Sequence, residues 1–429
     1  MQVLHVPYIF HPDPVGGTEV YVQNLIRALQ TLGWQGAIAA PGKTTHHYLW
    51  QDLPVYRYGL NPNPNPSEIY GPGDAVSLPA WRDILQTVQP AIVHFHALTS
   101  GVSLRHLQAA KALGLPVVFT YHTPTVSCQR GTLLRWGQEI CGGNLAVSPC
   151  GPCALQGLGV PQPLAQVLGR LPGTLTQRWP DRRGLWTALK FGGLVTQRQQ
   201  VFYDVMAEAT AIVAVCRWVQ DLLIANGVPP QKITLCRQGT QADAVDQPAA
   251  PHPAALRVAC LGRFDPVKGM GVLIAAWQAM PHARIALDLY GVGNPDYGAK
   301  LRAMAANDPR ITFREPVAAE QVVPTLQQYD LLAVPSQCLE TGPLVVYEAF
   351  AAGVPVVGSD LGGMAELVVS GVDGRLVRPH DDPLAWARVF QELTANPESL
   401  QRWRSGVQSP RTMDEVAIEM VALYGSLLA

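Results

Sequence analysis

The sequence predicts an α/β protein built from two domains, each with a parallel sheet. Three features support this prediction. The 429 residues are more than one ordinary hydrophobic core accommodates. Short apolar runs alternate with helical patterns along the whole chain, which is typical of parallel βα units. The alternation is interrupted at 241–255, where Asp, Ala, Pro and His dominate, so this stretch is predicted to be a linker.

The apolar runs place the expected elements in each domain. In the first domain, 1–240, we expect strands at 3–6, 37–40, 92–95, 117–121, 212–215 and 233–236, and helices at 18–30 and 103–113. In the second domain, 256–410, we expect strands at 257–261, 285–290, 311–313, 331–335 and 354–357. A last helix within 411–429 follows Pro410 and is expected to pack back on the first domain.

Composition and charge exclude several classes of protein. Hydrophobic residues make up 48% of the chain and charged residues 15%, as in a folded globular protein. The formal net charge of −1 argues against a nucleic-acid partner. No apolar run is long enough to cross a bilayer, and the start of the sequence does not predict a signal peptide. We therefore expect a cytoplasmic protein.

Two loops have the composition of phosphate-binding sites. Gly16 and Gly17 lie between the first strand and a helix, where backbone amides can approach a phosphate; a plain strand-to-helix turn explains them equally well. Arg263 and Lys268 lie in the loop that follows the first strand of the second domain. The guanidinium and the ammonium can converge there on a diphosphate, and the alternative is two solvated surface cations.

A pair of carboxylates follows later in the second domain. Glu340 is expected on a loop and Glu348 on the helix that this loop enters. The first turn of that helix offers free amides, and the two carboxylates can hold hydroxyls of two sugar rings. Alternatively, Glu340 caps the helix and Glu348 is a buried partner within it.

Together these motifs resemble family four of the retaining glycosyltransferases, the glycogen synthase-like or group 1 enzymes. The segments 90–96 and 120–122 and the pair Pro335-Ser336 also follow the order of that family. The resemblance implies the GT-B fold, in which two Rossmann-like domains with parallel sheets face each other across a cleft. It implies transfer from a UDP- or GDP-sugar to a saccharide or lipid-linked acceptor, in surface polysaccharide or glycolipid biosynthesis, with no cofactor required for catalysis.

The resemblance also implies roles for individual residues. The catalytic set would be His122, Arg263, Lys268 and Glu340, with His122 facing the donor sugar and Glu340 holding its hydroxyls. The donor-binding set would be Gly16, Gly17, Gly291, Gly293, Val317, Thr341, Gly342, Pro343, Leu344, Val345 and Glu348. In that set the two N-terminal glycines would contact the diphosphate and Glu348 the ribose. The segment that ends at Val317 lacks the glycine usual near the base, so the base stays open. The alternative for His122 is a core histidine.

Two other functions compete with glycosyl transfer. A nucleotide-sugar 2-epimerase shares the fold, but it would need its own acid–base carboxylates. A non-catalytic nucleotide-sugar-binding module would have no need for the whole set of His122, Arg263, Lys268 and Glu340.

Four cysteines lie close together in the first domain. Cys128, Cys141, Cys150 and Cys153 have a spacing that suits a tetrahedral metal site, most often structural zinc, in a stretch without a helix or strand pattern. An iron–sulfur cluster is the alternative metal centre. Unrelated reduced cysteines, or one redox pair, would need no metal.

An insertion at 155–200 carries basic residues interleaved with aromatic ones. They are Arg170, Arg178, Trp179, Arg182, Arg183, Trp186, Lys190, Phe191 and Arg198. This pattern favours an anionic lipid-linked acceptor or peripheral association at the inner face of the cell membrane. A solvated insertion with packed tryptophans is the alternative.

Overall fold

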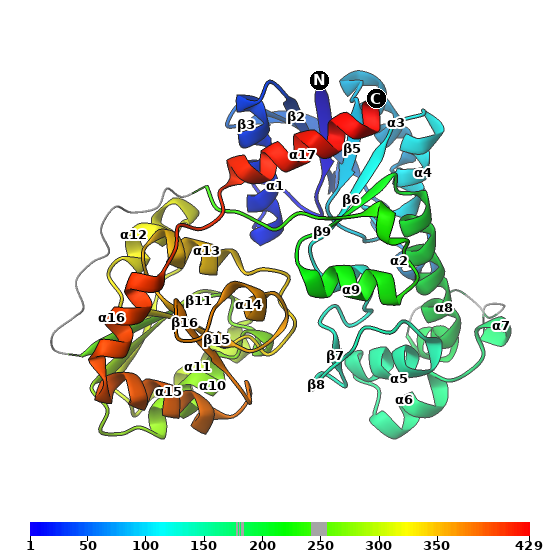
Figure 1. Ribbon diagram of the computed structural model, residues 1–429. Coiled ribbons are helices and arrows are strands. Elements are labelled where there is room, and N and C mark those ends of the chain that lie inside the picture. The colour runs from blue at the N-terminus through cyan, green and yellow to red at the C-terminus, as the bar shows by residue number, and fades with distance from the viewer. Residues whose placement is uncertain (177–178, 180, 182–183, 242–254) are drawn as a thin grey trace. The chain divides into compact units, whose positions relative to one another are not determined.

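The computed structural model describes residues 1–176, 179, 181, 184–241 and 255–429. Nearly all of the predicted linker, 242–254, and the basic residues Arg178, Arg182 and Arg183 lie outside the described residues. The chain forms two compact units (Figure 1). The first domain comprises Met1–Arg237 and Met413–Ala429, and the second comprises Gln238–Thr412.

The first domain is built on an eight-stranded sheet with the order β10-β9-β6-β5-β1-β2-β4-β3. All neighbours are parallel except β3, which is antiparallel to β4. The strands are β1 (Gln2–Val6), β2 (Gln35–Gly42), β3 (His46–Trp50), β4 (Leu53–Gly59), β5 (Ile92–Phe95), β6 (Val117–Tyr121), β9 (Ala211–Ala214) and β10 (Ile233–Leu235). The central strands are almost completely buried, as continuous apolar runs predict for a parallel sheet covered by helices.

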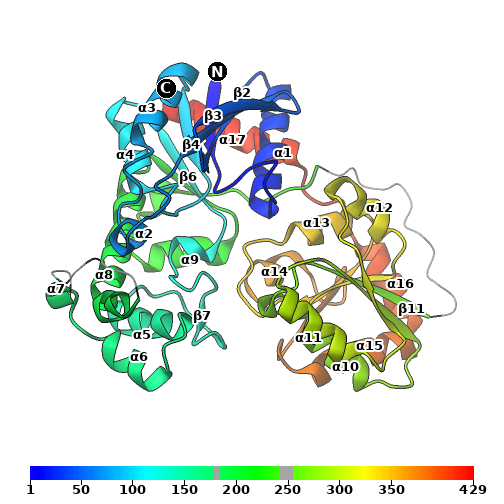
Figure 2. The same cartoon turned by 180° about the vertical axis from the view of Figure 1, so that it is seen from behind.

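Helices cover this sheet. They are α1 (Gly17–Thr31), α2 (Pro66–Tyr70), α3 (Leu78–Val88), α4 (Leu104–Ala112), α8 (Leu185–Glu208), α9 (Arg217–Ala225) and α17 (Met413–Leu428). The last helix, α17, lies against α1 in both views (Figures 1 and 2). Its Val416, Met420 and Tyr424 are buried in one cluster with Val22 and Leu25 of α1. The C-terminal helix is thus part of the core of the first domain.

A smaller group of elements separates β6 from α8. It contains the short hairpin β7 (Leu134–Arg135) and β8 (Glu139–Ile140), followed by α5 (Val147–Gly157), α6 (Gln162–Leu168) and α7 (Gly173–Thr176). Helices α5, α6 and α7 all contact α8, at the end of the domain remote from the chain termini (Figure 1). The cysteine stretch, expected to be irregular, therefore contains a hairpin and a helix.

The second domain has a six-stranded parallel sheet with the order β13-β12-β11-β14-β15-β16. Its strands are β11 (Leu256–Leu261), β12 (Ile285–Tyr290), β13 (Ile311–Arg314), β14 (Leu331–Val334), β15 (Val356–Ser359) and β16 (Gly374–Val377). Its helices are α10 (Met270–Gln278), α11 (Pro295–Ala305), α12 (Val322–Leu326), α13 (Leu344–Ala351), α14 (Gly362–Leu367), α15 (Pro383–Ala395) and α16 (Pro397–Gly406). The prediction of two α/β domains with parallel sheets is confirmed.

The strand order of the second domain fixes where a ligand is expected. The order runs outward in one direction from β11 to β13 and in the other from β14 to β16. In open parallel sheets, ligands bind at the carboxyl ends of the strands where the order reverses, which here means β11 and β14.

Within the described parts of the chain, no helix is both long and apolar enough to cross a membrane.

Candidate active site

The centre of the second domain's site is an ion pair between the loops that follow β11 and β14. Lys268, in the turn after β11, donates a hydrogen bond from Nζ to Oε1 of Glu340 at 2.5 Å. The hydroxyl of Ser336 donates to the same oxygen at 2.8 Å. Because β11 and β14 are adjacent and parallel, with Val258 opposite Leu331, their loops meet at one edge of the sheet.

Two glycines hold these loops in contact. Gly269 has a φ of +69°, and a Cβ there would lie 1.8 Å from the carbonyl oxygen of Pro335. A Cβ on Gly291, in the loop after β12, would lie 1.9 Å from the carbonyl oxygen of Gly262. Only glycine permits these approaches, because any Cβ would overlap the facing backbone. Gly291, expected to line the donor site, therefore also has a structural role in packing one loop on the next.

The electrostatics of the site favour charged forms of both partners. Burial acts to raise the pKa of Glu340, but the Lys268 ammonium and the Ser336 hydroxyl outweigh it and hold that pKa below its ordinary value. Burial acts to lower the pKa of Lys268, and Glu340 raises it above its ordinary value. Arg263 is exposed and makes no hydrogen bond or ion pair with any described residue. One cation of the predicted pair is therefore engaged, and the other is available.

Helix α13 adds amides and a second carboxyl group to the site. The helix begins at Leu344, with Pro343 as its N-cap, and among the described residues the amides of Leu344 and Val345 have no backbone partner, whereas that of Val346 donates to Pro343. Glu348 is the fifth residue of this helix, and its side chain makes no hydrogen bond or ion pair with another described residue. Burial raises the pKa of Glu348 to about 7. A partly buried carboxyl group with no partner is suited to accept hydroxyl groups from a ligand.

The other predicted donor-binding residues of this domain gather around the same helix. Thr341 is buried in the loop before α13, and Gly342 follows it with a φ of +131°. Val345 and Val317 both pack against one apolar cluster, which also contains Val346 of α13. The segment after β13 and the start of α13 therefore border the same apolar cluster. Gly293 pairs with Phe264 across the loops after β12 and β11.

In the first domain, the predicted phosphate-binding turn is partly occupied by the chain itself. Gly16 is the N-cap of α1, and both Gly16 and Gly17 are exposed. The amide of Gly16 donates to Oε2 of Glu19 at 2.9 Å. Burial raises the pKa of Glu19, and its bonds to backbone amides oppose that shift. A phosphate at this turn would share the helix N-terminus with the carboxyl group of Glu19, which the sequence motif alone does not indicate.

His122 belongs to a chain of buried histidines at the carboxyl ends of β1, β5 and β6. Its Nε2 lies 3.0 Å from Nδ1 of His96, and Nε2 of His96 lies 3.0 Å from Nδ1 of His5. Burial lowers the pKa of both His5 and His122 to about 3, so the rings are neutral at neutral pH. Each neutral ring carries one N–H, and the two bonds therefore tie the tautomer of His122 to those of His96 and His5.

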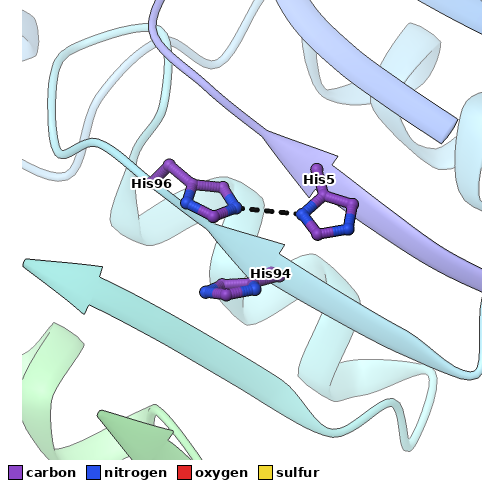
Figure 3. A group of neighbouring side chains, drawn as sticks. All are labelled: His5, His94 and His96. Carbon is purple, nitrogen blue, oxygen red and sulfur yellow. Dashed lines mark hydrogen bonds between the residues drawn. The ribbon is translucent and has the colours of Figure 1, made fainter. Parts of the chain in front are cut away.

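His94 lies against this chain but is bonded elsewhere (Figure 3). Its Nδ1 lies 2.6 Å from the hydroxyl of Tyr424, and its Nε2 lies 2.6 Å from the hydroxyl of Thr120. Among the described residues, His5, His94 and His96 form the one group of three potential metal ligands within 4.8 Å. Five of their six ring nitrogens already have hydrogen-bond partners, so we interpret the group as a hydrogen-bonded cluster.

The basic and aromatic residues of the insertion divide into buried and exposed ones. Lys190 is buried and lies 3.3 Å from Asp181, and Phe191 is completely buried. Arg198 donates from Nη2 to the carbonyl oxygens of Leu98 and Thr125, at 2.9 and 3.0 Å. Lys190, Phe191 and Arg198 therefore have structural roles. The exposed members are Arg170, Trp179 and Trp186.

The four clustered cysteines are all half-buried and line one cavity of the first domain. Cys128 follows the turn Pro124–Val126, and Cys141 follows β8. Cys150 and Cys153 lie inside α5.

Comparison with known families matches both domains of the chain. The family model of the Glycosyl transferase 4-like domain matches residues 16–239, more than half of the chain, and that of the Glycosyl transferases group 1 matches residues 255–396. A D-inositol 3-phosphate glycosyltransferase from Mycolicibacterium gilvum is 35% identical over 155 residues, which are 35% of each chain. The aligned region thus spans about a third of the length of this curated relative.

Solved structures with the same fold cover the whole chain. The Anabaena protein HepE, determined in complex with UDP and glucose, has a TM-score of 0.64 at 16% identity, over 99% of both chains. A sucrose-phosphate synthase from Thermosynechococcus elongatus has a TM-score of 0.66 at 20% identity, over 100% of this chain and 99% of the other. These neighbours are GT-B proteins, and the predicted fold class is confirmed.

Proposed function

Because the chain belongs to the group 1 glycosyltransferases, we propose that it transfers a sugar from a UDP- or GDP-linked donor to a saccharide or lipid-linked acceptor, with retention of configuration. The observation that carries this proposal is the Lys268–Glu340 pair at the carboxyl ends of β11 and β14, with Glu348 on α13, which has no hydrogen-bond or ion-pair partner among the residues that the structure describes. The HepE complexes with UDP and UDP-glucose support a nucleotide-sugar donor for a chain of this fold. Surface polysaccharide or glycolipid synthesis is the role we propose.

The diphosphate of the donor is the part of the substrate that gains negative charge as the glycosidic bond breaks. Arg263 has no partner among the described residues, so its guanidinium can bind a phosphate directly. The Lys268 ammonium has three donors and can keep Glu340 while donating to a phosphate oxygen. With the amides at the start of α13, these cations stabilise the departing diphosphate, so we propose catalysis without a metal ion.

The two carboxylates differ in environment and therefore in proposed role. Glu340 is ionised and fixed by Lys268 and Ser336, so it can hold hydroxyls of the transferred sugar while positive charge develops on the ring. Glu348 has no such partner within the described ranges of the chain and can accept the ribose hydroxyls of the nucleotide. The reaction then passes through an oxocarbenium-like ion pair, and we assign no nucleophile to the protein.

His122 is proposed to act in the transfer step as a neutral imidazole. A ring with a pKa of about 3 does not carry a positive charge that would repel an oxocarbenium-like sugar. Its tautomer is coupled to those of His96 and His5, so a change of tautomer at His122 requires matching changes at the other two rings.

The acceptor class is proposed from the exposed apolar residues of the insertion. Leu164 and Val167 on α6 and Leu185 and Trp186 at the start of α8 are 51%, 65%, 76% and 42% exposed. Arg170 lies between these two helices and is exposed as well. Exposed leucine and tryptophan in a segment that also carries an exposed arginine suit an anionic membrane surface, and we propose peripheral membrane binding through this region.

A direct test is the release of nucleoside diphosphate with and without acceptor. The proposed function requires acceptor-dependent release and a product with the anomeric configuration of the donor, which NMR of the isolated product determines. Release without acceptor would indicate an epimerase-type reaction, and donor binding without release would indicate a binding module; either would overturn the proposal. The donor itself is found by thermal shift with a panel of nucleotide sugars, because a bound ligand stabilises the native state.

A further inference from the structure

The four clustered cysteines have no part in the proposed transfer reaction, yet they surround one cavity. Cys128, Cys141, Cys150 and Cys153 come from three separate segments: the turn after β6, the residue that follows strand β8, and the helix α5. All four line the same cavity of about 230 Å³. The fold of this region therefore brings together four thiols that lie up to 25 positions apart in sequence.

The surroundings of the cavity suit an anionic cluster of thiolates. None of the described residues that line it carries a carboxylate, whereas Arg130 and Arg135 are both among them. Arg130 is fixed to α5, since its Nη1 donates to the carbonyl oxygen of Cys153 at 2.9 Å and to Oε1 of Gln156 at 2.6 Å. The amide of Trp136 donates to Sγ of Cys153 at 3.3 Å. Positive charge and an amide donor both stabilise sulfur in its ionised form.

The same geometry argues against a redox pair. Cys150-Gly151-Pro152-Cys153 lies within α5, which starts at Val147, so Cys150 is the fourth residue of the helix and not its first. Its thiol is therefore not placed at the helix N-terminus, the position that activates cysteines for disulfide exchange.

We propose that Cys128, Cys141, Cys150 and Cys153 bind one structural zinc ion. Binding replaces four thiol protons by one Zn²⁺, so four S–H bonds are lost, four Zn–S bonds form and four protons are released, with no change of oxidation state. A tetrahedral site with Zn–S bonds of about 2.3 Å holds its sulfurs about 3.8 Å apart. No three of these sulfurs lie within 4.8 Å of one another in the structure, so zinc draws them together.

The consequence of the site is to fix the segment that follows His122. Cys128 lies six positions after His122, and its amide donates to the carbonyl oxygen of Pro124 at 2.7 Å. The hydroxyl of the adjacent Ser127 lies 2.7 Å from the hydroxyl of Tyr121 and forms a hydrogen bond with it. Tyr121 immediately precedes His122 in the sequence. A metal bound to Cys128 therefore ties the end of β6 to the hairpin and to α5.

The test uses the full chain purified without added metal. We expect about one zinc per chain by elemental analysis, and four thiols that react with a thiol reagent only after a strong chelator removes the zinc. The double variant Cys128→Ser, Cys150→Ser should retain less than a tenth of the zinc. The control Cys216→Ser should retain all of it, because Cys216 is the N-cap of α9, a position that serine suits.

A second measurement does not depend on the variants folding. Cobalt substituted for zinc in the wild-type chain should give the intense d–d bands and sulfur-to-metal charge-transfer bands of tetrahedral thiolate coordination. A chain with no bound metal and four freely reactive thiols, or with a disulfide between any two of them, would overturn the proposal. Iron with acid-labile sulfide in place of zinc would do the same.

Discussion

Lys268 and Glu340, 72 positions apart in sequence, form an ion pair of 2.5 Å at the carboxyl edge of the second domain's sheet. Their side chains are 27% and 16% exposed, so each is largely removed from solvent while open to a ligand. Arg263 lies in the same loop as Lys268 and has no such partner among the described residues. Of the two cations of the predicted diphosphate site, Lys268 is thus ion-paired with a carboxylate, whereas Arg263 is ion-paired with none of the described residues. Removal of each should therefore have different effects.

Arg263→Ala should weaken donor binding and leave the stability of the fold unchanged, because the exposed guanidinium bonds to none of the residues that the structure describes. Lys268→Ala should reduce turnover by ~10²–10³-fold, as expected for loss of one group that stabilises transition-state charge. It should also lower the melting temperature, since Glu340 is left without its cation. Steady-state kinetics and thermal unfolding of both variants check these expectations.

The matched control for these two variants is Lys300→Ala, which removes an exposed lysine of α11 in the same domain. It should behave as the wild type in both measurements. A double variant Arg263→Ala, Lys268→Ala with transfer rates near those of the wild type would contradict the assignment of this site.

A pH dependence follows from the raised pKa of Glu348. In the folded chain this carboxyl group ionises near pH 7, well above its ordinary value of 4.5. The unfolded chain therefore loses this proton first, and the contribution of Glu348 to stability falls as pH rises from about 4.5 to about 7. Glu348→Gln removes this effect, so the variant should be more stable than the wild type above pH 7. Urea unfolding of both proteins at pH 5 and pH 8 measures the difference.

Donor affinity should rise as pH rises towards 7, whereas the contribution of Glu348 to stability falls over the same range. If ribose hydroxyls donate to the Glu348 carboxylate, the donor binds the ionised form, and its association constant should fall up to about tenfold per pH unit below pH 7. Titration calorimetry with UDP-glucose suits this test, because the diphosphate diester has no proton that titrates in this range. Equal pH dependence in the wild type and in Glu348→Gln would contradict the role of Glu348.

The sequence was sufficient to predict the two parallel sheets, because their central strands are continuous apolar runs. It was not sufficient for β3, His46–Trp50, whose first two residues are exposed at the edge of the sheet and break the apolar pattern. The 24-residue helix α8 was also missed, because its basic residues were interpreted as a surface. Lys190 and Arg198 instead pair with Asp181 and with carbonyl groups that are distant in sequence.

For the candidate site, motif positions predicted which residues gather at the carboxyl edges of the sheets, but not their mutual bonds. The Lys268–Glu340 pair depends on β11 and β14 being neighbours, which spacing in the sequence does not reveal. His5 was not singled out either. A signal for it was present, since a histidine within the apolar run of β1 must be buried and needs a hydrogen-bond partner.

The chain of histidines predicts that His96 affects the transfer step through its hydrogen bond to His122. His96→Leu keeps a buried side chain of similar size but removes both bonds of the chain. We expect kcat to fall at least about tenfold, within the range that positioned acid–base groups contribute, while the donor KM stays close to that of the wild type. The control is His106→Leu, which removes a buried histidine bonded to Ser77 and Ser103 and should lower stability without lowering kcat.

Membrane binding should depend on the exposed apolar residues at the start of α8. The wild type should float with vesicles that contain anionic lipid, and less so at high salt, because the basic residues contribute by charge. Leu185→Ser combined with Trp186→Ser should reduce the bound fraction several-fold. Leu384→Ser combined with Ile418→Ser removes two apolar side chains of similar exposure elsewhere and should have no effect. Equal flotation of both double variants would exclude this surface.

The kinetic roles of Glu340 and Glu348 should separate although both are carboxylates of one site. Glu340 is held by Lys268 and Ser336 and is proposed to contact the transferred sugar, where charge develops only as the bond breaks. Glu340→Gln keeps the shape and removes the charge, so it should lower kcat more than it raises the donor KM. Glu348 is proposed to hold the ribose, whose contacts are equal in the ground and transition states. Glu348→Gln should therefore act mainly on the donor KM.

Both variants must first be shown to be folded, because Glu340 also forms the ion pair that joins two loops. Glu340→Asp serves as a second variant at that position, since it keeps the charge but shortens the side chain and should recover part of kcat. Saturating donor should restore the rate of Glu348→Gln and leave that of Glu340→Gln low. The reverse pattern, with Glu348→Gln inactive at saturating donor and Glu340→Gln changed only in KM, would mean that the sugar and the nucleoside occupy the opposite ends of this site.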